Sequence, residues 1–337
     1  MKLVYYILRR FFFLFFIMIG VTLVIFLVSR IVPGDPALLM AGEGASLQDI
    51  ENLRHQWGLD RPLHIQYLTY LKNLLKGDFG RSIFTARPVL YDLKEYFPAT
   101  FELTVFSLLL ATLFGIFSGV VSANHKDKGI DHATRIFSLL GLSMPIFWLG
   151  LLLLLVIHYH FGLLFAGGRL SANLLAPKSI TGLYTIDSLL TGNWGVFKDS
   201  FLHLILPSIC LAMSVVGRIS RMTRSSVLNV IHENYVRTAK SKGLPHRLIS
   251  RRYVLRNALL PIITLIGVMF GRLLSGAVIT EIIFSWPGLG RYAVEATMSH
   301  DFVPLMGFSF LIAFLYGIVN LIVDILYSVF DPRVELS

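Results

Sequence analysis

The chain has 337 residues, of which 55% are hydrophobic and only 15% are charged, and its formal net charge is +10. A soluble domain carries roughly 25% charged residues, so this composition excludes an ordinary soluble protein and indicates a chain that lies largely in lipid. The basic excess is typical of the cytoplasmic loops of a membrane protein. Because the sequence contains no recognised nucleic-acid-binding motif, we expect no nucleic-acid partner.

Six segments are long and apolar enough to cross a bilayer, which takes about 20 residues for each helix. In chain order they are residues 11–32, 101–123, 136–159, 201–216, 258–284 and 304–330. The sequence therefore predicts an all-α integral membrane protein with six transmembrane helices. We expect residues 1–32 to form a short N-terminus and the first helix, and residues 101–337 to form the transmembrane core.

The segment between the first two predicted spans, residues 33–100, is long enough to form a subdomain outside the bilayer. Apolar residues recur at helical spacing over 63–75, directly after Pro62, and the glycines at 77 and 80 predict the end of that helix. A second long loop, residues 160–200, is rich in Gly, Ser and Thr. We expect these two loops to form a cap on the extracytoplasmic side.

The lysine and arginine residues of the loops predict the orientation, because they gather on the cytoplasmic side of a membrane protein. With the N-terminus inside, the inner segments hold seventeen basic residues and the outer segments hold eleven. The inner segments are 1–10, 124–135, 217–257 and the C-terminal residues, and the outer segments are 33–100, 160–200 and 285–303. Loop 217–257 alone has ten basic residues and one acid, Glu233. We therefore expect both termini to be cytoplasmic.

The basic loop 217–257 also has a pattern typical of two short helices joined by a turn. The first helix places Tyr235, Ala239 and Val236 on one face. Gly243 suits a left-handed cap at the end of this helix, and Pro245 suits the first turn of the next one. Two such helices form a knob that fits a groove in a partner protein. The alternative is a basic loop that only sets topology, and the pattern by itself leaves both interpretations open.

The sequence contains none of the nucleotide-binding or catalytic motifs that we searched for. There is no phosphate-binding G-x-x-x-x-G-K loop, no H-E-x-x-H zinc helix and no G-x-S-x-G nucleophile elbow. We therefore expect a chain that is not itself an enzyme, with no catalytic residue and with no cofactor or metal of its own. If the chain performs transport against a gradient, another protein supplies the energy. The alternative of a different class is an ion-coupled secondary transporter or channel. Many secondary transporters contain an internal repeat, and we find none in this sequence.

Several motifs resemble those of permease subunits of ABC importers for dipeptides, oligopeptides and nickel. YVRTAKSKGL at 235–244, followed by LRNALLP at 255–261, is similar to the EAA loop of these permeases. The other matching motifs lie in the same order along the chain. They are PGDP at 33–36, GLDRPL at 58–63, GDFGRS at 77–82, SMP at 143–145, RMTRSS at 221–226, WPGLGR at 286–291 and DPR at 331–333.

The loop departs from the EAA consensus in two ways that resemble the peptide branch of the family. Arg237, Thr238 and Ala239 stand where the consensus has Glu-Ala-Ala, and Leu260 and Pro261 come about one helical turn later than the consensus Leu-Pro. The resemblance implies a role in coupling to an ATPase for this whole set. Its members are Tyr235, Arg237, Thr238, Ala239, Gly243, Leu244, Pro245, Leu260 and Pro261.

The resemblance implies the architecture of a type I ABC importer permease in a bacterial inner membrane. Two homologous permeases would form the pathway, and two ATPase subunits would bind ATP and Mg²⁺ and grip the coupling loops. An extracytoplasmic binding protein would deliver a short peptide. The long loop 160–200, with GLYTID at 182–187, is more similar to the dipeptide branch than to the nickel branch. Longer peptides, nickel, glutathione and haem stay open as substrates.

The polar residues within the predicted spans include Arg272, Asn320 and Asp324, and a charge in a span costs ~2.5–3.5 kcal/mol on insertion scales. Arg272 lies midway along the fifth span, where it either lines the pathway and meets a peptide carboxylate or pairs with an acid on another chain. Asn320 and Asp324 are four residues apart on the sixth span and share one face. We expect a structural role for Asp324, paired with Arg218 or Arg221 near the inner surface.

Overall fold

The computed structural model describes residues 2–31, 36–41, 44–165 and 167–330. The sequence motif at 331–333, the C-terminal residues and most of the motif at 33–36 lie outside these described residues. The described chain is helical, which confirms the predicted all-α fold. Its helices are α1 (Lys2–Ile31), α2 (Pro36–Ala41), α3 (Leu47–Trp57), α4 (Leu63–Leu75), α5 (Val89–Asn124), α6 (Gly129–Ser143), α7 (Ile146–Leu153), η1 (Leu154–His160), α8 (Tyr184–Leu190), α9 (Trp194–Ile231), α10 (Asn234–Ser241), α11 (His246–Leu248), η2 (Ile249–Leu255), α12 (Arg256–Gly276), α13 (Val278–Ile283), α14 (Leu289–Met298) and α15 (Phe302–Phe330).

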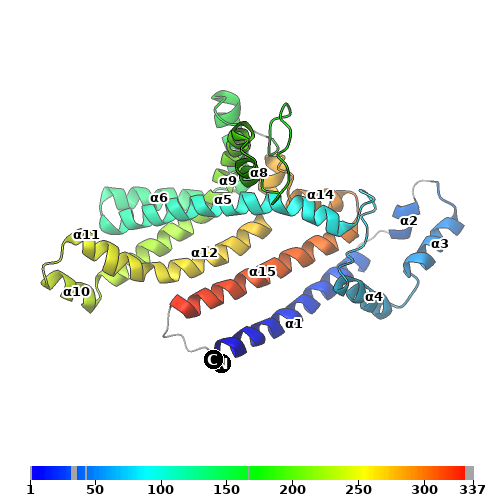
Figure 1. Ribbon diagram of the computed structural model, residues 1–337, viewed down its shortest axis with the longest axis horizontal. Helices are drawn as coiled ribbons and strands as arrows, with labels where there is room; N and C mark the ends of the chain where they lie inside the picture. The colour runs from blue at the N-terminus through cyan, green and yellow to red at the C-terminus, as the bar shows by residue number, and fades with distance from the viewer. Residues whose placement is uncertain (1, 32–35, 42–43, 166, 331–337) are drawn as a thin grey trace.

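Five stretches of the described chain are long and apolar enough to cross a membrane as single helices, and one bent helix pair brings the number to six. The five are Leu8–Ile31, Val89–Asn124, Trp194–Ile231, Ile249–Gly276 and Phe302–Ile325. They run roughly along the long axis of the molecule in Figure 1, with α1 beside α15. The predicted six-span architecture is therefore present, with one span that is not a straight helix.

The expectation of one continuous third span over 136–159 is wrong. Helices Gly129–Ser143 and Ile146–His160 meet at an angle of 104°. Pro145 has no backbone N–H to donate and disfavours the helical conformation of the residue before it. Met144 accordingly has the extended values φ −72° and ψ 129°. The apolar stretch is long enough for a span, but the proline divides it.

The fourth and fifth helices also differ from the predicted spans at their ends. The predicted span 201–216 is the middle of α9, which has 38 residues and keeps Pro207 inside the helix. It continues past Arg218, and its last turns contact α5 through Val227 and α6 through Arg224. The fifth helix starts before the predicted residue 258 and ends at Gly276, and residues 278–283 form the separate helix α13.

Glycines let the long helices approach one another closely. On α5, a Cβ atom at Gly119 would lie 2.5 Å from Cβ of Thr223 on α9. On α12, a Cβ atom at Gly271 would lie 2.7 Å from Cδ2 of Tyr316 on α15. Real side chains do not approach this closely, so a larger residue at Gly119 would force α5 and α9 apart, and one at Gly271 would force the Tyr316 ring to move. Contacts of this kind are the usual means of helix association in lipid, where no hydrophobic force draws helices together.

The segment between α1 and α5 forms an arm of short helices, α2 to α4, at one end of the molecule (Figure 1). Helix α4 has the predicted bounds 63–75, and Gly77 follows it with a φ of +79°, a value that glycine adopts without strain. Helices α10 and α11 lie at the opposite end. We call these two ends the arm end and the coupling end, and the side of the membrane on which each lies stays a prediction at this point.

The loop 161–183 and helix α8 are fixed to α5 by a buried ion pair. Arg169 Nη2 lies 2.6 Å from Oε2 of Glu102, and both side chains are 6% exposed. The backbone N–H and hydroxyl of Thr185 both donate to Oε1 of Glu102, at 2.8 and 2.6 Å. Asp187, with no exposed surface, accepts from the N–H groups of three residues, 180 to 182. These contacts anchor Arg169 and residues 180–182 to α5 and α8, while Leu163 and Leu175 of the same loop stay largely exposed.

Candidate coupling loop and pathway residues

Helix α10 is an amphipathic helix with one face packed on the ends of the long helices. Val236 is fully buried and Ala239 is 3% exposed, and both join a cluster with Ala123 of α5 and Val227 of α9. Tyr235, predicted on the same face, is 41% exposed. Partial burial, with the nearby carboxylate of Glu233, raises the pKa of the Tyr235 phenol. The packed face is therefore centred on Val236 and Ala239, and Tyr235 lies at its edge.

The turn after α10 has the predicted left-handed cap. Gly243 has a φ of +71°, its N–H donates to the carbonyl of Lys240, and the N–H of Leu244 donates to the carbonyl of Ala239. These two bonds define a Schellman motif. The N–H groups of residues 248 and 249 then donate to the carbonyl of Pro245, which places Pro245 at the start of the next helix as predicted.

Helices α11, η2 and α12 follow one another without a break, so the coupling turn is joined directly to a spanning helix. The segment η2 has π-helical geometry, and Ile249 and Val254 of η2 are buried in the same cluster as α10. Leu260 and Pro261 lie beyond it on α12 and are half-buried. Leu260 and Pro261 therefore lie inside helix α12 and are not part of the exposed turn.

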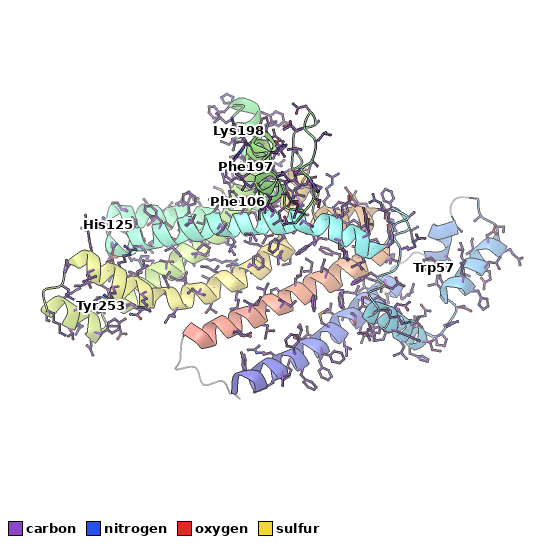
Figure 2. All side chains as sticks on the ribbon, viewed as in Figure 1. Trp57, Phe106, His125, Phe197, Lys198 and Tyr253 are labelled. Atoms are coloured by element: carbon purple, nitrogen blue, oxygen red, sulfur yellow. The ribbon has the colours of Figure 1, made fainter. Side chains whose placement is uncertain are left out.

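The exposed surface of the coupling end is strongly basic. Arg237, Thr238 and the residues that follow them up to Gly243 are exposed, apart from Ala239. A shallow groove beside them is lined by Pro245, Leu248 and four arginines, at 247, 251, 252 and 256. Figure 2 shows Tyr253 at this same end of the molecule. A basic surface of this kind suits an acidic docking surface on a partner.

A second constellation at this end fixes α6 to α9. Arg224 Nε and Nη2 donate to the two carboxylate oxygens of Asp131 at 2.8 and 2.7 Å, which is a bidentate pair. Asp131 is fully buried, and it also accepts from Ser122 and from the N–H of Asp127. The RMTRSS motif drew attention to Arg224, but nothing in the sequence indicated Asp131, which is 93 residues away.

Two arginines lie close together between α9 and α12, and neither has an acidic partner among the described residues. Arg218 Nη1 of α9 lies 3.9 Å from Sδ of Met269 on α12. Arg272 lies one turn further along α12 than Met269. Arg272 is exposed in the single chain, and it lies four residues before the end of α12, not midway along a span that reaches residue 284. The structure therefore places Arg272 near Arg218, and the sequence did not predict that these two arginines lie near one another.

Comparison with known protein families identifies the chain. Residues 111–336 match the family described as the binding-protein-dependent transport system inner membrane component, and residues 3–104 match its N-terminal family. The chain belongs to this family. It is a multi-pass permease, and the family placement gives no support to the alternative of an ion-coupled transporter or channel.

The permease has close relatives over almost its whole length. It is 46% identical to the probable D,D-dipeptide transport system permease protein DdpB of Escherichia coli K12, over 94% of this chain and 93% of the relative. It is 41% identical to the dipeptide transport system permease protein DppB of the same organism, over 94% of each chain. A solved amino acid ABC transporter covers 70% of this chain and 90% of its own at 18% identity, with a TM-score of 0.45.

The remaining predicted polar residues of the permease lie on α15. Asp324 Oδ2 forms an ion pair of 3.0 Å with Nη2 of Arg10 on α1, so the expected pairing with Arg218 or Arg221 is wrong. Asn320 is half-buried one turn earlier on the same helix. The pair joins the first and last spanning helices, which supports the predicted structural role of Asp324. The sequence alone did not predict that the first and last helices contact one another through this ion pair.

Proposed function

We propose that this permease and a second homologous permease form the pathway by which dipeptides enter the cytoplasm. Two separate ATPase subunits, which bind ATP and Mg²⁺, supply the energy, and an extracytoplasmic binding protein delivers the peptide. The names of the two relatives, a probable D,D-dipeptide transport system permease and a dipeptide transport system permease, support the substrate class. Nickel, glutathione and haem are not favoured by any residue arrangement described above.

The observation that carries the proposal is the construction of the coupling turn. The inner face of α10 is buried against α5 and α9, and its exposed basic face is free to meet a partner. The chain then passes through a rigid cap into α12. A displacement of α10 by a closing ATPase dimer would therefore move α9 and α12 together. ATP drives the change because it binds one state of the ATPase pair better than the other.

The proposal predicts ATP-dependent uptake by the assembled complex and none by the permease alone. Proteoliposomes that contain both permeases and both ATPases, with the binding protein and a labelled dipeptide outside, are expected to accumulate peptide only when ATP is inside. The purified permease alone is expected to release no phosphate from ATP. Phosphate release by the lone chain, or uptake driven by membrane potential without ATP, would contradict the proposal.

The proposal also predicts the orientation. The coupling end faces the cytoplasm with both termini, and the arm and residues 160–200 face outward, as the seventeen inner against eleven outer basic residues indicate. In a Cys210→Ala background, Ser241→Cys is expected to react with an impermeant thiol reagent only from the inside. Lys72→Cys on α4 and Lys178→Cys are expected to react only from the outside. Labelling of Ser241→Cys in intact cells would reverse the topology.

A further inference from the structure

A cavity of about 290 Å³ lies where the end of α1 meets the arm. Its wall includes Arg30 of α1, Trp57 of α3, Gln66 and Tyr70 of α4, and Asp78 of the loop that follows. Figure 2 shows Trp57 on the arm, far from the coupling end. The volume is close to the lower limit of ligand pockets, roughly 300 Å³. The cavity has no part in the coupling turn or in the arginine pair between α9 and α12.

Three buried polar atoms in this wall have no hydrogen-bond partner among the described residues. They are Nε of Arg30, Oε1 of Gln66 and the hydroxyl of Tyr70. No acid among the described residues forms an ion pair with Arg30, whose guanidinium lies 5.4 Å from the centre of the Phe26 ring. An unsatisfied buried polar group costs ~1–3 kcal/mol. A ligand that satisfies all three groups at once is therefore favoured.

The cavity is preformed, because two tyrosines hold α4 against α1. The hydroxyl of Tyr67 donates to the carbonyl of Ile19 at 3.2 Å and lies 3.1 Å from the hydroxyl of Thr22. The ring of Tyr70 stacks on Phe26, with ring centres 6.2 Å apart. Burial raises the pKa of Tyr70 to about 12, so its phenol stays protonated at neutral pH and keeps a proton to donate.

The wall offers groups for both an anion and a cation. Arg30 and the phenol of Tyr70 donate to an anion, and Arg61, whose side chain folds over Gly58, adds a second guanidinium. Oε1 of Gln66 and the carboxylate of Asp78 accept from a cation, and Asp78 is positioned by a 2.9 Å bond from the N–H of Gly80. The chemistry that matches this wall is a zwitterion with one anionic group and one N–H-bearing ammonium.

Apolar surfaces lead from the cavity along the spanning helix. Leu27, Arg30 and Ile31 share one face of α1, because they are three and four residues apart. Leu27 is 37% exposed and Ile31 is 75% exposed. Helix α4 has no buried residue and exposes 62% of Leu68. The hydrocarbon chains of a lipid can pack on these exposed apolar side chains, whereas a small soluble zwitterion has no apolar part to place there.

We propose that the cavity binds the headgroup of a phospholipid with a primary ammonium, of the phosphatidylethanolamine type. The phosphate oxygens accept from Arg30 and Tyr70, the ammonium donates to Gln66 and Asp78, and one acyl chain lies along Leu27 and Ile31. The lipid bridges α1 and α4 and thereby anchors the arm to the spanning helices.

The test is lipid binding to the assembled permease complex in detergent, measured by native mass spectrometry. The probes are phosphatidylethanolamine and phosphatidylcholine with identical acyl chains. The wild type is expected to bind phosphatidylethanolamine several-fold more tightly, because the trimethylated headgroup has no N–H to donate. Arg30→Gln is expected to lower phosphatidylethanolamine binding about tenfold, the effect of losing one charge-assisted hydrogen bond. Arg30→Lys is expected to recover part of this loss.

The matched control is Arg87→Gln, which removes an arginine of the same region that pairs with exposed Glu95 and does not line the cavity. It is expected to bind lipid as the wild type does. Tyr70→Phe, which removes a single oxygen atom, decides the matter if Arg30→Gln fails to assemble, and it is expected to bind several-fold less lipid. Equal binding by Arg30→Gln or Tyr70→Phe and the control, or equal binding of the two lipids, would overturn the proposal. Displacement of the lipid by a dipeptide would make the cavity a substrate site and would overturn the proposal. Equal affinity for soluble O-phosphoethanolamine would show that the acyl chains make no contact, and this result would overturn the proposal as well.

Discussion

Gly243→Val is expected to lower ATP-driven peptide uptake about tenfold while leaving the permease in the membrane. Gly243 has a φ of +71°, a region in which a β-branched residue is strained by about 1–3 kcal/mol. Apart from its two chain neighbours, no described residue has an atom within 4 Å of the position that a Cβ atom would occupy, so the effect comes from the backbone and not from crowding within the chain. The strained cap would turn η2 and α12 away from their positions relative to α10. Uptake per assembled complex, measured beside ATPase activity, reports this loss of coupling.

Two variants separate backbone strain from a clash with the ATPase. Gly243→Asn adds a side chain of similar size to valine, but asparagine tolerates the left-handed conformation, so we expect it to keep most of the uptake. Ser241→Val places the same β-branched side chain two residues earlier, within the helical part of α10, and is expected to have a small effect. If Gly243→Val transports normally, or if asparagine is as harmful as valine, the cap is not the element that transmits the movement.

The cap of α10 and the bounds of α4 could be predicted because their causes are local. A left-handed glycine after a helix and a proline at the start of the next one act through neighbouring backbone groups alone. The same is true of Pro62 before α4 and Gly77 after it. In such places a few residues of sequence contain the whole physical explanation. The orientation of Tyr235 was missed because helix phase alone does not show which side the neighbouring helices cover.

The predictions that were wrong concern the ends of spans and contacts between distant residues. Pro145 was visible in the sequence, but the length of the apolar stretch was given more weight than the proline, and the bend of 104° was missed. The partner of Asp324 is Arg10, 314 positions earlier in the numbering of the same chain, and no local pattern indicates such a pair. Tertiary packing decides these features, and periodicity does not report it.

Arg272→Ala is expected to assemble normally and to import peptide about tenfold more slowly per complex. Arg272 lies one turn from Met269, which Arg218 contacts, and no acid among the described residues forms an ion pair with either guanidinium. Removal of Arg272 therefore breaks no ion pair within the described chain and is not expected to destabilise the permease. An anionic group of the passing peptide would lose one charge-assisted hydrogen bond, worth ~1.5–3 kcal/mol. Arg272→Lys keeps the charge and is expected to restore part of the rate.

The charge of the substrate gives the sharper comparison. Ala-Glu and Ala-Gln differ by one carboxylate and have nearly the same shape, so Arg272→Ala should slow import of Ala-Glu more than import of Ala-Gln. Arg87→Ala, which removes an arginine just before α5 that has its own partner Glu95, is the matched control and should affect both peptides equally. An acid on the second permease would give a different result, because it would be left unpaired in a buried site by Arg272→Ala. Less assembled complex, with unchanged uptake per complex for both peptides, would therefore assign Arg272 to the interface between the permeases and reject its role in the pathway.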